Sequence, residues 1–598
     1  MYLICIEIGD WICYNIEEGK IYRKTKEKMK YLKFKSEYDR NPINIVKGYD
    51  HHIFDANEII KELRKYREGV LVFEIYPGVH IDVFKTKIIE PLDPDLLINI
   101  EDYTKTELEI NEMLAYNLTD DRVFGIMSHH TIEDFYSEKN IGLVQEKVKS
   151  VSGLRIVYGF GASLIEYDYL VYVDITRWEI QLRYRKGMTN FKTNNPNEDT
   201  LRKYKRGYFV EWRVADRIKK NTYKSLDYVI DGSTDDYVMI TKDAYDAALH
   251  LLTTKPFRLV PYFDPGVWGG QWMKEVCNLE ENGSNYAWSF DGVPEENSLK
   301  FSFGGKIIEL PALNLVFFRA PKLLGERVYG RFGTDYPIRF DFLDTVEGGN
   351  LSLQVHPLTE YIQDKFGIHY TQDESYYILY AEEDSVVYLG VKPDINPERM
   401  IEDLERANRG EIVFDDEKYI NKFPVKTHDH ILIPGGTIHC SGKNTMVLEI
   451  STSSYIFTFK LWDWGRIGLD GRPRPVHINH GKESIQFERN TEWVKKNLIN
   501  RFEKINKVET RTGLHEREFI ETRRFFFNKK IKTKTEGSFN MLNLVEGAAA
   551  VIESPTNQFE PFTVHYAETF IIPENVKEYT IRPREKKMKC GVIKAYVR

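Results

Sequence analysis

Hydrophobic and polar positions follow two different patterns along the chain, and the change falls near residue 255. Before it, apolar runs of strand length, such as residues 69–78, are followed by stretches with helical spacing, such as residues 97–118. Residues 154–183 contain two further apolar strands around a glycine turn. Strands that alternate with helices are typical of an α/β fold. We therefore predict an N-terminal α/β domain over residues 1–255.

The first 35 residues differ from the rest of this region. Two extended patterns, at residues 2–8 and 20–25, are joined by the turn-like segment 17–20 and followed by a lysine-rich segment. This pattern predicts a small sheet element at the start of the chain.

After residue 255 the spacing shortens to strands separated by Gly, Pro, Asn and Asp turns. Helical patterns interrupt these strands near residues 396–408 and 490–506. Regularly spaced short strands indicate a barrel or jelly roll. Residues 516–598 repeat the pattern but contain a single histidine, His565. We predict a multidomain α+β protein, in which a β domain with helical insertions at 256–515 precedes a smaller β domain at 516–598.

Composition narrows the possible classes of function. The 598 residues are 42% hydrophobic and 29% charged, which excludes a largely disordered chain. The formal net charge of -8 lacks the basic excess typical of nucleic-acid or anionic-membrane binding, so we expect neither partner. Five scattered cysteines, no signal-peptide pattern and no apolar run of about 20 residues predict a cytoplasmic protein.

Four residues of the β-rich region could bind one metal ion, namely Gln354, His356, Glu374 and His439. Gln354 and His356 are two positions apart on a predicted strand, so their side chains leave the same face. Glu374 begins the next apolar run, and a Pro-Gly-Gly turn presents His439 at the start of a later strand. One amide oxygen, two imidazoles and one carboxylate suit a divalent ion such as zinc, with positions left for water or substrate. Any one of them alone could equally be a polar group at a strand end.

The sequence around these four residues resembles a known family. The turn PGGTIH at residues 434–439 matches the P-x-G-x-x-H signature of cupin barrels. The segments LSLQVHP, DESYYIL and IPGGTIHCSGKNTMVLEI follow in the order seen in type I mannose-6-phosphate isomerases. The resemblance runs from about residue 261 to about residue 480, with a weaker continuation to the C-terminus. It implies a zinc-dependent double cupin, of jelly-roll folds, that interconverts an aldose phosphate and a ketose phosphate through an enediol. The implied substrates are mannose 6-phosphate and fructose 6-phosphate.

The resemblance also implies roles for single residues. It places the zinc ligands on the four residues above, with one ion per chain and no other cofactor. Glu449, ten residues after His439, takes the position of a glutamate near the metal and is the candidate for proton transfer. Arg466 matches a family arginine that would hold an anion or shield the enediolate, although a surface salt bridge is the alternative.

Two of the departures from the family's pattern remove or change a positive charge. Lys460 stands where the family commonly has an active-site arginine, which keeps the charge but loses the forked contact that suits phosphate. Gln372 replaces a lysine two residues before the glutamate ligand. Both changes bear on which sugar is bound, and leave the metal chemistry intact.

The N-terminal region carries weaker signals. Gly159 and Gly161 follow a strand, but the lysine and hydroxyl of a phosphate-binding loop are missing, so a decayed nucleotide-kinase-like fold is one alternative. Asp174 ends a later strand as a metal-binding aspartate would. The basic, aromatic run at residues 203–220 is either a solvated or interdomain face or an anion site. Two adjacent histidine pairs, His51–His52 and His129–His130, are interpreted as structural.

These observations leave three hypotheses for function. The first is a metal-dependent sugar-phosphate isomerase with an added α/β domain that regulates or binds. The second is a carbohydrate-sensing or scaffolding protein that retains the metal without turnover. The third is a bifunctional enzyme with separate chemistry in its first 255 residues. The sequence does not determine the oligomeric state.

Overall fold

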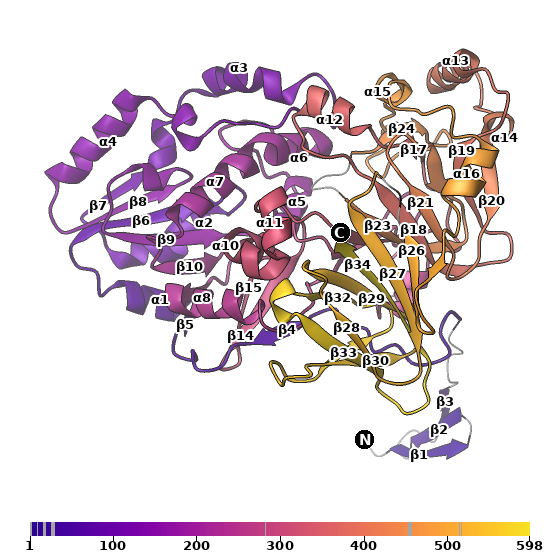
Figure 1. Ribbon diagram of the computed structural model, residues 1–598. Helices are drawn as coiled ribbons and strands as arrows, with labels where there is room; N and C mark the ends of the chain where they lie inside the picture. Colours follow the sequence, from indigo (N-terminus) through magenta and orange to yellow (C-terminus); the bar gives the residue numbers. More distant parts are fainter. Residues whose placement is uncertain are drawn as a thin grey trace.

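The computed structural model describes residues 3–598 except 9, 16–19, 25–29, 281–282, 453–456, 514 and 516, and describes side chains from residue 30 onward. The strands β1 Leu3–Ile8, β2 Asp10–Asn15 and β3 Lys20–Lys24 form a small antiparallel sheet (Figure 1). The predicted sheet element at the start of the chain therefore exists. It has one strand more than expected, because residues 10–15 form a strand of their own.

A seven-stranded sheet forms the core of the α/β unit, which comprises residues 53–251. Its spatial order is β5-β11-β10-β9-β6-β8-β7. The parallel strands are β6 Gly69–Ile75, β7 Leu96–Asn99, β8 Leu154–Gly159, β9 Tyr169–Asp174 and β10 Tyr228–Asp231, and the antiparallel ones are β11 Val238–Thr241 and β5 Ile53–Phe54. Nearly every residue of β6 is buried, as expected for a parallel strand covered on both faces.

Helices connect and cover these strands. They are α1 Ala56–Leu63, α2 Ile81–Phe84, α3 Glu107–Leu118, α4 Glu138–Ser150, α5 Arg177–Arg185, α6 Thr200–Arg206, α7 Trp212–Thr222 and α8 Lys242–Leu251. The strands predicted within residues 154–183 are β8 and β9, which are separated in the sheet by β6. They are thus parallel neighbours of one central strand and do not form a hairpin.

The glycine turn after β8 is closed by a buried carboxylate. Glu74, near the end of β6, accepts hydrogen bonds from the backbone N–H groups of Gly161 and Ser163, each at 2.8 Å. These are the donors that a bound phosphate would require. Asp174, at the end of β9, forms an ion pair with Lys219 at 2.8 Å. Burial raises the pKa of Glu74 to about 7, although both N–H groups favour its charged form.

Two further sheets form the central sandwich, between residues 262 and 462. One sheet contains β12 Tyr262–Asp264, β13 Trp288–Gly292, β16 Arg339–Asp344, β23 Thr445–Ser451, β18 Glu374–Ala381 and β21 His430–Ile433, in that spatial order. The other contains β20 Ile420–Pro424, β19 Val386–Val391, β22 His439–Ser441, β17 Leu353–Val355 and β24 Phe459–Trp462. Glu374 of the first sheet contacts His439 of the second, so these faces of the two sheets meet.

The helices around the central sandwich lie in its connections. They are α9 Trp272–Val276, α10 Leu313–Leu324, α11 Glu326–Phe332, α12 Thr359–Phe366, α13 Pro397–Asn408, α14 Asp416–Tyr419, α15 Ile478–Lys482 and α16 Thr491–Asn497. The helix expected near 396–408 is α13. The one expected at 490–506 ends at Asn497, because residues 503–504 already form a strand.

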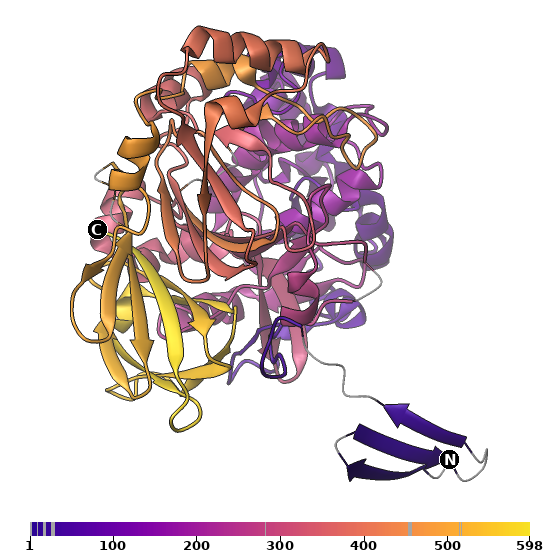
Figure 2. The same cartoon turned by 90° about the vertical axis from the view of Figure 1, so that its right-hand side faces the viewer.

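The C-terminal sandwich packs two sheets around an apolar core of its own. Its strands are β25 Glu503–Lys504, β26 Glu509–Gly513, β27 Ile520–Phe527, β34 Cys590–Val597, β29 Asn540–Glu546 and β32 Thr569–Ile572 in one sheet, and β28 Ile531–Lys534, β33 Glu578–Pro583, β30 Ala549–Glu553 and β31 Phe562–His565 in the other. It lies beside the central sandwich in both views (Figures 1 and 2). Strands β25 and β26 precede residue 516, so this unit includes residues before that position.

The predicted class, a multidomain α+β protein, is confirmed. A three-stranded sheet of β4 Ile43–Ile45, β14 Ser298–Phe303 and β15 Lys306–Pro311 joins the first part of the chain to the region after residue 255. None of the helices in the described ranges has the length and hydropathy to span a bilayer. The cysteines whose side chains are described, Cys277, Cys440 and Cys590, are buried and unpaired.

Glu74 leads to a prediction about stability and pH. Its folded-state pKa of about 7 lies above its ordinary value of 4.5, so its protonated form is favoured in the folded protein. Stability from this group is present below pH 4.5 and is lost as the pH rises to 7, by at most about 3 kcal/mol. Glu74→Gln mimics the protonated form. The unfolding free energy of the variant, minus that of the wild type, should therefore rise between pH 4.5 and 7.5 in denaturant titrations. A difference that does not change with pH would contradict this account.

Candidate metal centre

Three strands bring the predicted metal ligands together. In the second sheet of the central sandwich, Gln354 of β17 lies directly opposite His439 of β22. His356 follows β17 by one residue, and Glu374 begins β18 in the facing sheet. Because residues two apart on a strand share a face, Gln354 and His356 both point toward Glu374. All four side chains are buried.

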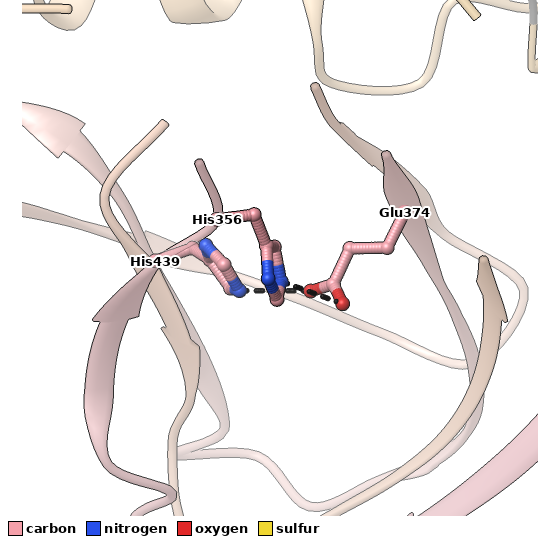
Figure 3. Close-up of side chains that lie close together, drawn as sticks. All are labelled: His356, Glu374 and His439. Atoms are coloured by element: carbon pink, nitrogen blue, oxygen red, sulfur yellow. Dashed lines mark ion pairs between the residues drawn. The ribbon is translucent and has the colours of Figure 1, made fainter. Parts of the chain in front are cut away.

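Both imidazole rings point toward the carboxylate of Glu374 (Figure 3). His356 Nε2 lies 2.9 Å from Glu374 Oε2, and His439 Nε2 lies 2.8 Å from Glu374 Oε1. Of the described His, Cys, Asp and Glu residues, these three form the cluster able to hold a metal ion, with ligand atoms within 4.8 Å of one another.

Hydrogen bonds behind the imidazole rings fix which nitrogens face the centre. His356 Nδ1 lies 2.8 Å from the carbonyl oxygen of Phe457, and His439 Nδ1 lies 2.9 Å from that of Thr437. A carbonyl oxygen only accepts, so each Nδ1 must carry the hydrogen. In the neutral rings, both Nε2 lone pairs are then directed at Glu374. This is the arrangement that orients histidines in metal sites.

The resulting geometry fits a divalent cation. Two nitrogen lone pairs and a carboxylate packed together without a proton or cation would repel one another in a buried site. His356 Nε2 and Glu374 Oε1 are buried and have no hydrogen-bond partner of acceptable geometry among the described residues. Although burial opposes its charge, the two histidines hold the pKa of Glu374 well below its usual range. The carboxylate is therefore available as a ligand.

Gln354 lies at the edge of the same cluster. Its amide nitrogen is 3.1 Å from His439 Nε2, and its oxygen is 3.3 Å from the hydroxyl of Ser352. A half-turn of the amide group exchanges these two atoms at nearly constant shape. The oxygen would then face the centre as a fourth ligand.

Gln372 connects the metal cluster to Glu449. Its amide nitrogen donates to Glu374 Oε2 at 3.1 Å and to Glu449 Oε1 at 3.2 Å. Gln372, expected only as the replacement of a family lysine, therefore joins the two carboxylates. Its place beside Glu374 has a local signal, because the two residues are two apart in an extended segment.

Glu449 lies on β23, one strand from Glu374, and is flanked by Asp341 of β16. Burial raises the pKa of Glu449 well above its ordinary value, and the neighbouring Glu374 and Asp341 add to this effect. Arg339 lies next to Asp341 and pairs with it at 2.8 Å. Asp341 and Arg339 were not among the expected site residues, because they become neighbours of Glu449 only through strand pairing.

Lys460 lies beside Gln354 on the neighbouring strand β24. Cross-strand partners share a face, so its side chain leaves toward the same side as Gln354. Burial lowers the pKa of Lys460 to about 7, and repulsion from Arg474 contributes to this shift. Lys460 therefore gains or loses its charge near neutral pH.

Arg466 is occupied by protein groups. Its guanidinium forms an ion pair with Asp463 and donates to the carbonyl oxygen of Asn350 at 2.6 Å. Asp463 also binds Arg474 at 3.0 Å. The salt bridge considered as the alternative for Arg466 is therefore present. A contact of Arg466 with substrate stays a prediction.

The fold and the site together define a class of protein in which an α/β unit is joined to a β-sandwich that contains a buried His-Glu-His centre. Residues 55–254 match a family described as a domain of unknown function, DUF8485. Mannose-6-phosphate isomerase ManA of Bacillus subtilis is 25% identical over 236 residues, which cover 39% of this chain and 69% of the relative. Mannose-6-phosphate isomerase of Streptococcus mutans is 23% identical over 250 residues, or 42% of this chain and 73% of the relative.

Solved structures were also found. A crystal structure of mannose 6-phosphate isomerase from Bacillus subtilis covers 57% of this chain and 99% of its own, with 17% identity and a TM-score of 0.46. The expected resemblance to mannose-6-phosphate isomerases, with an additional N-terminal region, is confirmed by the sequence relatives.

Proposed function

We propose that this chain is a metal-dependent isomerase that interconverts an aldose phosphate and a ketose phosphate. The observation that carries the proposal is the buried convergence of His356, Glu374 and His439, with Glu449 linked to it through one amide. The named activity of the sequence relatives supports the reaction class. Mannose 6-phosphate and fructose 6-phosphate are the substrates we infer.

The centre would hold zinc through His356, Glu374, His439 and the oxygen of Gln354. Two imidazoles, a carboxylate and an amide oxygen are a donor set that zinc accepts. A bound divalent ion polarises sugar oxygens and stabilises the negative charge of an enediolate.

Glu449 is the group we assign to proton transfer between C1 and C2. Isomerisation needs a base that takes a proton from one carbon and returns it to the next. A carboxyl whose pKa is raised above its ordinary value holds the proton more firmly between the two steps. Gln372 holds it beside the metal cluster, and its amide donates to Glu449 without contributing a charge. Asp341 and Arg339 form a neutral pair behind it.

Lys460 would stabilise the enediolate in its charged form, because it extends from the strand beside Gln354. We assign Arg466 to positioning. Its bonds to Asp463 and Asn350 order the segment that follows β24.

For domain organisation we propose residues 1–255, 256–515 and 516–598, the second and third being cupins and the third lacking a metal site. The pairing of β25 and β26 with β27 supports an earlier start for the last of these domains, near residue 500, in place of residue 516. The closed glycine loop at Glu74 supports a nucleotide-kinase-like unit that has lost phosphate binding.

A carbohydrate-sensing protein without turnover is the second candidate. It is favoured by one observation, the grouping of Glu374 and Glu449 on either side of a neutral Gln372. Two acidic groups without a cation between them would oppose an enediolate.

The metal assignment predicts one divalent ion per chain. His356→Ala and His439→Ala should each lose most of the zinc measured by elemental analysis, because a buried ligand is removed while the other units keep their own cores. His430→Ala is the matched control, since His430 is an equally buried histidine of the β18 sheet outside the cluster. Full zinc content in both ligand variants would exclude the site.

The proton-transfer assignment predicts that purified protein incubated with mannose 6-phosphate in heavy water exchanges the hydrogen at C2, as followed by NMR. Glu449→Gln should keep its metal and lose this exchange by about two orders of magnitude or more, the range for removal of a general base. Glu74→Gln, another buried carboxyl, is the control and should exchange normally.

The outcomes separate the two candidate functions. No exchange by the wild type with any phosphorylated or free aldose, despite sugar binding, would favour the sensing protein. Exchange by Glu449→Gln at the wild-type rate would remove Glu449 from the reaction and leave the isomerase assignment standing.

The role assigned to Lys460 predicts that turnover depends on pH. Its pKa of about 7 means that the charged form is lost as the pH rises through 7. If that form stabilises the enediolate, turnover should fall above pH 7. In Lys460→Arg this fall should disappear, because a guanidinium stays charged. Lys594→Arg, in a buried lysine of the C-terminal sandwich, should retain the fall. Identical pH profiles for wild type and Lys460→Arg would assign the titration to another group.

A further inference from the structure

A cavity of about 330 Å³ lies between the α/β unit and the central sandwich. Its volume is in the range of small-molecule sites. Four Lys or Arg side chains, three Asp or Glu side chains and two histidines line it, together with apolar groups. One wall comes from helix α7 of the α/β unit. The opposite wall comes from residues 293–295, 334–339 and 367–370. Neither unit alone encloses it.

The cavity lies close to the metal centre. Arg339, in its wall, pairs across β16 and β23 with Ser451, which in turn pairs with Glu374 on β18. Two strand spacings separate Arg339 from Glu374, or about 10 Å. Tyr370, also in the wall, belongs to the segment that leads directly into Gln372 and Glu374. The Arg339 wall of the cavity is therefore two strands away from the metal cluster.

The other side of the cavity lies at the carboxyl edge of the α/β sheet. Asp216 of α7 lines the cavity and accepts a hydrogen bond, at 3.0 Å, from Tyr76, the residue that follows β6. One turn further along α7, Lys219 binds Asp174 at the end of β9. Open α/β sheets bind their ligands beyond the carboxyl ends of their strands.

Most charges around the cavity are already balanced. Arg177, buried behind the wall, pairs with both Asp216 and Glu295, and Arg213 donates to Glu295 at 2.6 Å. Two cations and two carboxylates thus form one neutral group. Arg339 is likewise paired with Asp341.

Two positive charges remain without a carboxylate partner among the described residues. Arg217 donates to the carbonyl oxygens of Ser128 and His130, each at 2.6 Å, and forms no ion pair with the described carboxylates. Lys220 is exposed, and its ammonium lies 4.9 Å from the centre of the Phe317 ring. Of the lining carboxylates, Asp335 accepts no hydrogen bond from the described residues. The buried Nε of Arg213 also lacks an acceptor there.

We propose that this cavity binds the phosphate end of the sugar phosphate, and that the α/β unit supplies the anion contacts through Lys220, Arg217 and Arg213. The inference rests on the proposed function for the identity of the ligand. A hexose 6-phosphate carries its phosphate at the end opposite to C1 and C2. The phosphate would therefore lie against α7 while C1 and C2 face Glu449, and Asp335 would accept hydrogen bonds from sugar hydroxyls.

This assignment agrees with the changes from the mannose-6-phosphate isomerase pattern in the central sandwich. Gln372 has no charge, Arg466 is bound to Asp463, and Lys460 is a single cation without the forked contact that suits phosphate. Further anion contacts must then come from elsewhere. The first part of the basic run does not provide them, because Lys203 and Lys205 are buried against backbone carbonyls and Arg206 pairs with Glu211.

Binding of sugar phosphate to the full-length, zinc-loaded protein, measured by calorimetry, tests the proposal. Lys220→Glu should weaken binding of mannose 6-phosphate by about tenfold or more, the effect of losing a charge-assisted contact, and leave free mannose unchanged. Lys224→Glu makes the same charge change at an exposed lysine outside the cavity and should bind like the wild type. Asp335→Asn should weaken both sugars alike. Inorganic phosphate should compete with mannose 6-phosphate in the wild type and fail to do so in Lys220→Glu.

The binding measurements test the site whether or not the protein turns the sugar phosphate over. Wild-type affinity in Lys220→Glu, or no binding of mannose 6-phosphate by the wild type at millimolar concentration, would overturn the site. Binding that depends on Lys220 without any C2 exchange would keep the site and reject the isomerase. C2 exchange whose Michaelis constant for mannose 6-phosphate is the same in Lys220→Glu would keep the isomerase and reject the site.

Discussion

The candidate site depends on one constraint, which is that two imidazole nitrogens contact the same buried carboxylate. Glu374 belongs to one sheet of the central sandwich, whereas His356 and His439 belong to the other. Their Nδ1 hydrogens are used by backbone carbonyls, so the rings cannot turn away without leaving a buried carbonyl unsatisfied. The cluster is therefore stable only when the two sheets hold their register and a positive charge lies between the ligands.

That requirement explains how the neighbouring polar groups are arranged. With Glu374 charged, a second charged carboxylate at Glu449 is costly in the same dry interior, and the shift of its pKa reflects this cost. Gln372 donates to both carboxylates without adding a charge, and Arg339 compensates Asp341. The inner face of the sheet thus contains little free positive charge. An anionic substrate would need its counter-charge outside this face, which is where helix α7 lies.

Some of this could be predicted from the sequence, because it depends on local rules. Strand periodicity placed Gln354 and His356 on one face, and the Pro-Gly-Gly turn placed His439 at a strand start. The roles of Asp341 and Arg339, and the contact of Gln372 with Glu449, depend on which strands pair, and pairing across more than 70 residues leaves no local signal. The roles of the lysines in the basic run at residues 203–220 could not be predicted from local spacing either. Helical spacing cannot distinguish Lys203, whose ammonium is bound by carbonyls of the preceding loop, from Lys220, which faces the cavity.

The junction between the α/β unit and the central sandwich is built to keep that cavity in one shape. Arg177 of α5 is buried between Asp216 of its own unit and Glu295 of the other. Asn314 of α10 reaches across to bind both Asp174 and Lys219. Separating the two units would leave these charges without their partners, and breaking a buried ion pair typically costs about 3–5 kcal/mol. Such an interface resists hinge motion, so α7 and Arg339 remain at a fixed separation. A ligand that fits between them meets a preformed site, and less of its binding energy is spent on ordering the protein.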